Sequence, residues 1–389
     1  MVAAAGSGDV IAASNAEWSG SISAQVRAFT HDAVDARQNN LYTSLATEPE
    51  WFWEWDDGKQ RLIITPFARW DGDDDARRHA DLRKFYWSIV ATRWEFRLGI
   101  NKVFWGVTES QHLVDVINQT DWVEDVDGED KLGQPMANLA IIGPRGTFDI
   151  YVLPYFRQRT FPGADGRPRS DPFVDTDQSQ FESPDREHHV DGAIRWARSA
   201  DIFDIGLSYF AGTTRDPTYS LGSRENEPVL VPFYPVIKQL GIDVQATTGP
   251  WLLKFEGIHR SGQNNDVNAI TTGIEYTFNG VLESVVDLGW VVEYLYDDRG
   301  EDGPTSFEDD VMIGIRVALN DAQSTEALLG AIIDASGDAG LWTLEASRRL
   351  GANWKISADA RYYQEVAPDS ILYSLRHDDY VQLTAAFFF

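Results

Sequence analysis

The sequence contains no cysteine, and two further scarcities narrow its class. Without cysteine there is no disulfide framework, thiol nucleophile or thiolate metal site. No run approaches the roughly 18 consecutive apolar residues that a membrane-spanning helix needs, which excludes a helical membrane protein. Basic residues are few: 33 Lys and Arg stand against 61 Asp and Glu, so the formal net charge is -28. Such a charge argues against nucleic acid or an anionic membrane surface as a partner.

The amino-terminal residues lack the basic and apolar regions of a signal peptide. Residues 1–8, Met-Val-Ala-Ala-Ala-Gly-Ser-Gly, predict a start methionine followed by a flexible leader, any signal peptide having been removed. We therefore expect a leader over residues 1–16. No linker or longer repeat divides residues 17–389, which predicts a single domain of ample size.

What the sequence has instead is alternation of apolar and polar residues over segments of about ten residues, bounded by turn residues. The clearest segments are residues 21–28, 94–101, 148–157, 239–246, 311–320 and 355–362. This period of two predicts half-buried β-strands. About 18 strands are expected, beginning near residues 17, 50, 59, 80, 94, 136, 147, 189, 202, 237, 251, 268, 285, 310, 325, 340, 354 and 379. The segments near residues 50 and 136 alternate poorly, so about 16 strands is the alternative.

Short connections between these segments alternate with long ones. Tight turns are predicted near residues 57–58, 92–93, 144–145, 199–200, 249–250, 279–280, 321–322 and 351–352. Longer polar loops are predicted near residues 31–48, 72–79, 103–135, 158–187, 214–235, 262–267, 298–308 and 366–377. Short turns at one rim and long loops at the other are what a transmembrane barrel requires. A soluble sandwich or propeller would need Greek-key or blade-scale regularity, which the sequence does not show.

The last residues alternate from Tyr380 onward, and the chain ends on Phe389. This terminal strand resembles the closing strand and assembly signal of Gram-negative outer-membrane β-barrels of the porin class. The resemblance implies an all-β fold, a transmembrane antiparallel up-and-down barrel with short periplasmic turns and long extracellular loops. It also implies a location in the bacterial outer membrane, contact with membrane lipid and lipopolysaccharide, and insertion by the outer-membrane assembly machinery.

Charged residues on the strands should face the lumen, because a charge facing hydrocarbon at mid-depth costs ~2–4 kcal/mol. The predicted pore-lining residues are Arg27, Arg61, Arg69, Lys84, Arg97, Arg157, Arg195, Asp243, Glu256, Glu275, Asp287, Glu293, Arg316 and Arg361. Basic residues prevail in the first half of the chain and acidic ones in much of the second. Since sequence order is angular order in such a barrel, we expect a positive side of the lumen facing a negative one. The alternative is that these charges pair across neighbouring strands.

Residues 103–135 form the longest segment without strand character. Porins that this chain resembles often fold a long loop inward to narrow the lumen, and long loops in compact proteins are commonly functional. We predict a constriction loop here, with an external lid as the alternative. The candidate constriction residues are Asp121, Glu124, Asp125 and Asp127. Ca²⁺ could bind to carboxylates of Asp125, Asp127 and Glu129, although their spacing does not match an EF-hand. No other cofactor is predicted.

An enzymatic site would need a histidine held beside a carboxylate or a nucleophile. The candidates in the sequence are His188 and His189 beside Asp191, and His377 beside Asp378. Both groups lie where a loop meets a strand, and polar residues are expected there in any case. Barrels with side-chain-filled interiors also have far fewer strands than this chain predicts. We therefore predict that the protein is not an enzyme.

The sequence thus predicts an outer-membrane channel for passive diffusion of small hydrophilic solutes, with selectivity set by pore width and opposed charged walls. A substrate-specific channel or exporter for sugars or polysaccharides is the main alternative. An exporter of acidic polysaccharide would need a strongly basic lumen, whereas the predicted lumen is mixed. A barrel-type hydrolase and a structural or adhesive barrel are further alternatives. The solute, the ion preference and the oligomeric state do not follow from the sequence.

Overall fold

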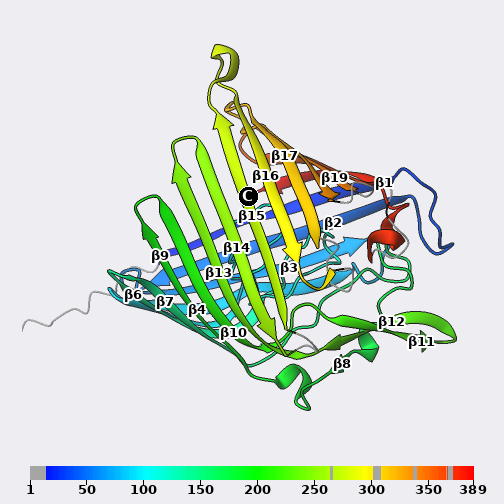
Figure 1. Ribbon diagram of the computed structural model, residues 1–389, viewed down its shortest axis with the longest axis horizontal. Coiled ribbons are helices and arrows are strands. Elements are labelled where there is room, and N and C mark those ends of the chain that lie inside the picture. Colours follow the sequence, from blue (N-terminus) through cyan, green and yellow to red (C-terminus); the bar gives the residue numbers. More distant parts are fainter. Residues whose placement is uncertain (1–14, 263–265, 301–307, 336–339, 365, 367–370) are drawn as a thin grey trace, which may run out of the picture.

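The computed structural model describes residues 15–262, 266–300, 308–335, 340–364, 366 and 371–389. Its strands form a closed antiparallel barrel of 18 strands (Figure 1). The barrel strands are β1 (Asn15–Phe29), β2 (Leu41–Trp55), β3 (Gln60–Asp71), β4 (His79–Val90), β5 (Trp94–Asn101), β6 (Gln134–Gly143), β7 (Gly146–Leu153), β9 (Asp191–Ala200), β10 (Phe203–Thr213), β13 (Val236–Thr248), β14 (Trp251–Ser261), β15 (Val267–Phe278), β16 (Asp287–Asp297), β17 (Asp309–Ala318), β18 (Glu326–Asp334), β19 (Gly340–Leu350), β20 (Trp354–Gln364) and β21 (Tyr380–Phe388). The predicted all-β barrel and its 18 strands are confirmed, and the alternative of 16 strands is wrong.

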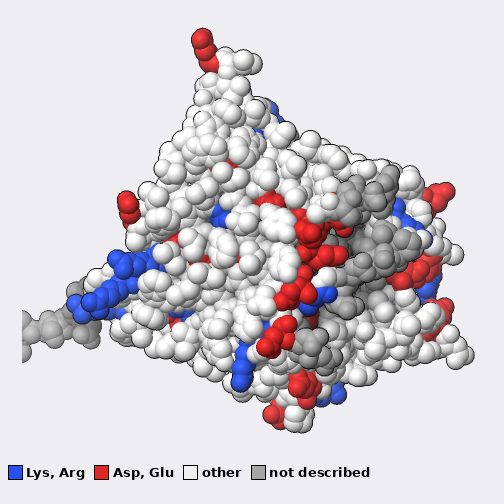
Figure 2. All heavy atoms as spheres, viewed as in Figure 1, with Lys and Arg blue, Asp and Glu red and all other residues white. Residues whose placement is uncertain are grey.

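Alternation along each strand gives the wall an apolar outer face and a polar inner face. In β13, Leu240 and Ile242 are exposed, whereas Gln239 and Asp243, which flank them, are buried toward the lumen. Figure 2 shows an outer wall over β9, β10, β13 and β14 that is mostly free of charge. Such a belt suits contact with hydrocarbon, where charge is costly. Among the described residues, no helix is long and apolar enough to cross a membrane.

The barrel is closed by pairing of the first and last strands. β1 pairs with β21 from Ser21 opposite Phe388 to Phe29 opposite Tyr380. The terminal Phe389 exchanges backbone hydrogen bonds with Gly20, and its ring lies 5.2 Å from that of Trp18. The leader expected at residues 1–16 falls mostly outside the described residues, and β1 already includes residues 15 and 16.

The long loop predicted at residues 31–48 is wrong in its second part, because β2 begins at Leu41. Thr43 and Leu45 face outward there, and Tyr42 and Ser44 are buried toward the lumen. This part of β2 pairs with β1, for example Thr43 with Val26. Threonine in an outward position hid the alternation, since it counts as polar in a sequence but fits a strand well.

The segment predicted as a polar loop at residues 214–235 contains a hairpin of β11 (Thr218–Arg224) and β12 (Glu227–Tyr234). With the short β8 (Gln180–Phe181) it forms a separate three-stranded sheet beside the rim that carries the long loops (Figure 1). Glu225 and Asn226 both have positive φ, 53° and 70°, as the tight turn of a two-residue hairpin requires. Val229 and Val231 bury one face of β12.

Short 3-10 helices occupy several of the connections. They are η1 (Thr176–Gln178), η2 (Arg186–His188), η3 (Val281–Glu283) and η5 (Ile371–Leu375). We refer below to the rim with the connections β2–β3, β4–β5 and β6–β7 as the short-turn rim, and to the opposite end as the long-loop rim.

Candidate functional site

The connection between β5 and β6, residues 102–133, lies inside the barrel and is called the inner loop below. Its Trp105, Val114 and Ile117 are almost completely buried. They form one apolar cluster with inward side chains of β6, β7, β9, β10, β13, β14 and β15, including Tyr151 and Phe210. These wall residues would otherwise face water, so burying them holds the inner loop against this part of the wall.

Glu256 on β14 binds the first part of the inner loop through backbone N–H groups. The carboxylate is fully buried, and its Oε1 accepts hydrogen bonds from Val107 N (2.6 Å), Thr108 N (3.0 Å) and Thr108 Oγ1 (2.8 Å). Gly106 allows this approach, since it has a φ of +133° and an added Cβ would lie 2.9 Å from Glu256 Oε1. A buried charge is tolerated here because several donors converge on it.

Glu293 on β16 binds the next residues of the loop in the same way. Its carboxylate is also fully buried and accepts bonds from the backbone N–H groups of Glu109 (2.8 Å) and Ser110 (2.8 Å). The side chain of Glu109 then reaches the wall cations, 2.8 Å from Arg316 and 3.6 Å from Lys254. The predicted acidic side of the lumen is therefore occupied in large part by the inner loop.

The acidic end of the inner loop binds the basic side of the wall. Glu124 accepts hydrogen bonds from Arg69 on β3, at 2.8 and 3.0 Å from Nε, and lies 2.7 Å from His79 Nε2. Asp121 lies 2.6 Å from Arg83 on β4, and both side chains are buried. These charge-assisted contacts join the loop to strands on the side opposite β14 and β16.

Asp125 and Asp127 extend this contact to the strands that close the barrel. Asp125 lies 3.6 Å from Arg27 on β1 and 3.5 Å from Arg361 on β20. Asp127 lies 3.1 Å from the same Arg361. All four predicted constriction residues thus lie inside the barrel and contact basic wall residues.

The environment shifts the pKa values of these loop carboxylates in opposite directions. Burial opposes ionisation of Glu124, but its hydrogen bonds with His79 and the charge of Arg69 hold the pKa of Glu124 well below its ordinary value. Burial, together with repulsion from Asp125, raises the pKa of Asp127 to about 7. Asp127 therefore changes charge near neutral pH.

His112 joins the two ends of the inner loop. Its Nε2 lies 2.9 Å from Glu129, and its Nδ1 lies 4.0 Å from Glu256. Burial favours the neutral ring, but these two carboxylates prevail and raise the pKa of His112 to about 10. The ring of Phe104 packs edge-on against the imidazole, with centroids 4.7 Å apart. A protonated His112 therefore links two acidic groups.

Most other predicted pore-lining residues pair with neighbours on the wall. The pairs are Arg61 with Glu54, Lys84 with Glu50, Arg97 with Glu95, Arg195 with Asp243, and Lys254 with Glu275. Some lumen charges therefore pair locally, as in the alternative expectation, and others are bridged by the inner loop. A field between opposed basic and acidic sides of the lumen stays a prediction.

Two predicted pore-lining residues lie at the ends of strands or beyond them. Arg157 follows the end of β7, so it belongs to a loop and not to a strand. It contacts Asp81 at 2.8 Å and donates a hydrogen bond to the carbonyl of Gly133, the last residue of the inner loop. Asp287 lies at the short-turn rim, where it accepts hydrogen bonds from Gly280 N and Asn320 Nδ2. Alternation alone could not distinguish these two residues from the other predicted pore-lining residues. A charged residue at the end of a strand continues the same alternation as the inward residues within the strand.

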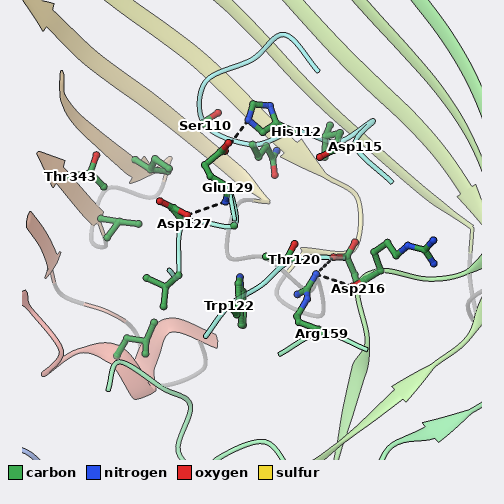
Figure 3. A pocket seen from close by; sticks show the side chains of 18 of the residues that line it. Ser110, His112, Asp115, Thr120, Trp122, Asp127, Glu129, Arg159, Asp216 and Thr343 are labelled. Atoms are coloured by element: carbon green, nitrogen blue, oxygen red, sulfur yellow. Dashed lines mark hydrogen bonds and ion pairs between the residues drawn. The ribbon is translucent and has the colours of Figure 1, made fainter. Parts of the chain in front are cut away.

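A cavity of about 640 Å³ remains between the inner loop and the far wall. Figure 3 shows Asp127 and Glu129 of the inner loop on one side and Thr343 of β19 on the other. The wall residues that line this part of the cavity are Leu328, Gly330, Ile332, Leu341, Thr343 and Glu345. A space of this size, bordered by charged and apolar groups, is suited to a small solute.

A second cluster of charged residues, which the sequence does not indicate, lies at the long-loop end of the same cavity. Asp216, in the connection after β10, lies 2.8 Å from Arg159 and 3.1 Å from Arg260. The guanidinium of Arg159 also lies over the ring of Trp122, 5.0 Å from its centroid (Figure 3). Despite burial, these two arginines lower the pKa of Asp216. Asp216 and Arg159 are in loops, where no period indicates which way a side chain points.

The described residues contain no group of three or more His, Asp or Glu side chains placed to hold a metal ion. In this structure Asp125 and Asp127 contact Arg361, and Glu129 contacts His112. Ca²⁺ binding at these three carboxylates stays a prediction.

Comparison with known proteins relates the fold to outer-membrane barrels. No protein-family model matches the sequence, and no curated protein matches it. Among solved structures, OmpT of Vibrio cholerae, an outer membrane protein folded in vitro and described in its trimer form, is similar with a TM-score of 0.50 and 8% identity. That match covers 97% of this chain and 100% of the other. A triple mutant of the Rhodopseudomonas blastica porin has a TM-score of 0.43 and 11% identity, over 96% of this chain and 100% of the other. At such identities the likeness concerns the fold alone.

Proposed function

We propose that this protein is a passive diffusion channel of the bacterial outer membrane for small hydrophilic solutes. The observation that carries the proposal is the inner loop. It is bound to Glu256 and Glu293 on one side and to Arg69 and Arg361 on the other, and it leaves a charged cavity beside it. A barrel of 18 strands is wide enough to hold an aqueous lumen, and a fixed loop narrows it.

This proposal includes no catalytic step. Asp191 lies 2.8 Å from the candidate His189, but its other oxygen lies 2.9 Å from Arg215, and Asp378 contacts Arg167 at 2.5 Å. These pairs connect long-loop segments to the wall, which is a structural role. Membrane lipid and lipopolysaccharide would contact the outer belt, and the assembly machinery would recognise the terminal strand ending at Phe389.

Single-channel recording in a planar bilayer tests this proposal. Purified protein, shown to be folded by its β-sheet circular dichroism and by heat-dependent gel mobility, is added to one side in KCl. Stable, uniform conductance steps are expected, because the inner loop is held at both ends and should not fluctuate freely. Folded protein that inserts without conductance would contradict the diffusion channel.

A further inference from the structure

The inner loop leaves one part of the wall uncovered, and this gap is called the lane below. Its ion pairs and hydrogen bonds reach Arg316 on β17 at one end and Arg361 on β20 at the other. Within the described residues, no such bond joins the inner loop to β18 or β19. The cavity is lined by side chains of these two strands. The lane between the inner loop and β18–β19 is therefore the path that a solute would follow.

The wall of the lane presents two carboxylates side by side. Glu345 on β19 and Asp359 on β20 are direct cross-strand partners. Asp359 accepts a hydrogen bond from Gln382 at 3.4 Å, and the side chain of Glu345 has no ion pair or hydrogen bond among the residues that the structure describes. The nearby Arg361 is engaged by the inner loop. Like charges directly opposite each other destabilise a sheet, so a cation from solution would be favoured between them.

The other side of the lane is also acidic. The inner loop contributes the side chains of Glu109, Asp127 and Glu129, which line the cavity. Glu109 is shared by two wall cations, whereas Asp127 has Arg361 and Glu129 has His112. Each of these three carboxylates thus has a cationic partner, and the negative charge without an ion pair lies on the wall pair, Glu345 and Asp359. Most arginines that line the same cavity, such as Arg159 and Arg260, lie at its long-loop end.

An apolar row runs along the wall beside these charges. Met312, Ile332 and Leu341 occupy neighbouring positions on β17, β18 and β19, since Met312 pairs with Ile332 and Ile332 with Leu341. Leu328 lies next to Glu345 in the same register. These side chains line the cavity and not the lipid face. An aqueous barrel lumen is normally polar, so a row of this kind offers contact to the apolar part of a solute.

The long-loop rim carries negative charge above the lane. Figure 2 shows acidic side chains gathered where β16 ends and β17 begins. Asp297, Asp298, Asp309 and Asp310 lie at these strand ends. An acidic mouth raises the local concentration of cations and their rate of entry. This observation is independent of the residues inside the lane and indicates the same sign of solute.

We propose that the lane selects small organic cations in which an ammonium or guanidinium group is attached to a short apolar chain. The inference rests on the proposed channel function. The charged group would pass between Glu345 and Asp359 on the wall and the acidic inner loop, while the chain contacts Ile332 and Leu341. An anion would be repelled by the same carboxylates, and a hydroxylated cation would gain nothing from the apolar row.

Reversal potentials in planar bilayers test both parts of the inference. A KCl gradient measures the ratio of K⁺ to Cl⁻ permeability, and bi-ionic conditions compare n-butylammonium with the hydroxylated Tris cation. We expect cation preference, and n-butylammonium should be several-fold more permeant than Tris. In about 0.1 M KCl, where screening roughly halves the interaction, removing one carboxylate charge about 6 Å from the path should lower K⁺ permeation and raise Cl⁻ permeation by almost twofold each. The K⁺/Cl⁻ ratio should therefore fall about threefold. The double variant E345Q/D359N should therefore lower it about tenfold.

Two further variants separate charge from apolar contact. Ile332→Thr should reduce the preference for n-butylammonium over Tris and leave the K⁺/Cl⁻ ratio unchanged. Glu283→Gln, in the exposed turn between β15 and β16, is the matched control and should change neither quantity. Anion preference in the wild type, or an unchanged ratio in E345Q/D359N, would overturn the inference while the channel itself stands. Absence of any conductance would instead refute the channel, and the inference with it.

Discussion

Replacing Glu256 by Gln tests whether wall carboxylates hold the inner loop in place. The Glu256 carboxylate accepts three hydrogen bonds at one oxygen, from Val107 N, Thr108 N and Thr108 Oγ1. A hydrogen bond to a charged group contributes about 1.5–3 kcal/mol, and a neutral one about 0.5–1.5 kcal/mol. Each of the three bonds should therefore lose about 1 kcal/mol. The second oxygen, which accepts from Val114 N at 3.3 Å, becomes an amide donor and adds to the loss.

A loss of about 3 kcal/mol raises the population of the open loop about 100-fold, since each 1.4 kcal/mol is a factor of ten. Amide hydrogen exchange of the protein in detergent micelles measures this opening directly. Protection of the amides of residues 107–110 should fall about 100-fold in E256Q, and those of β13 and β14 should keep theirs. Current traces should show brief closures or substates that the wild type lacks. Unchanged loop protection, or equal loss in the strands, would refute the proposed anchor; Glu283→Gln is the control.

Three further outcomes follow from the structure. Because burial and Asp125 raise the pKa of Asp127 to about 7, the K⁺/Cl⁻ permeability ratio should rise between pH 6 and 8 in the wild type. In D127N the rise should be much smaller and confined to the lower part of this range, where Asp130, with a pKa raised by burial to about 6, still titrates. Despite burial, Glu129 and Glu256 raise the pKa of His112 from 6.5 to about 10, so its contribution to loop docking is complete below about pH 6.5 and lost as pH rises through about 10. Loop amide exchange, corrected for its intrinsic pH dependence, should accelerate over that window, and in H112N it should not. Ile313→Arg, on the outward face of β17, should cost ~2–4 kcal/mol in urea titrations of liposome-inserted protein, against about 1 kcal/mol or less for Ile313→Val.

Much of the barrel could be predicted because apolar and polar residues alternate along most of its strands. In β13, for example, the alternation predicts Leu240 and Ile242 on the outer face and Asp243 on the inner face, and the structure places them there. The start of β2 was missed because Thr43 occupies an outward position there, and the hairpin of β11 and β12 was missed because its strands lie outside the barrel and lack its pattern. Alternation assigns a face to a residue only within a strand that has one polar side.

The position of the inner loop could be expected from its length, but its contacts could not. Glu256 and Glu293 bind backbone N–H groups of Thr108 and Ser110, and every non-proline residue carries such a group. No residue type in the loop therefore indicates which wall carboxylate it will meet. Nor does the sequence show that Asp216, distant in the chain from Arg159, will contact it.

The same contacts explain the uneven order of charges along the chain. The basic residues of the early strands, such as Arg69 and Arg83, meet the acidic end of the inner loop. The acidic residues of later strands, such as Glu256 and Glu293, meet its N–H groups. Both sides are thus bound in large part by the loop between them. The field along the solute path must then come from charges that the inner loop leaves uncovered. Glu345 is such a charge, which is why its replacement should alter selectivity more than replacement of a paired wall residue such as Arg195.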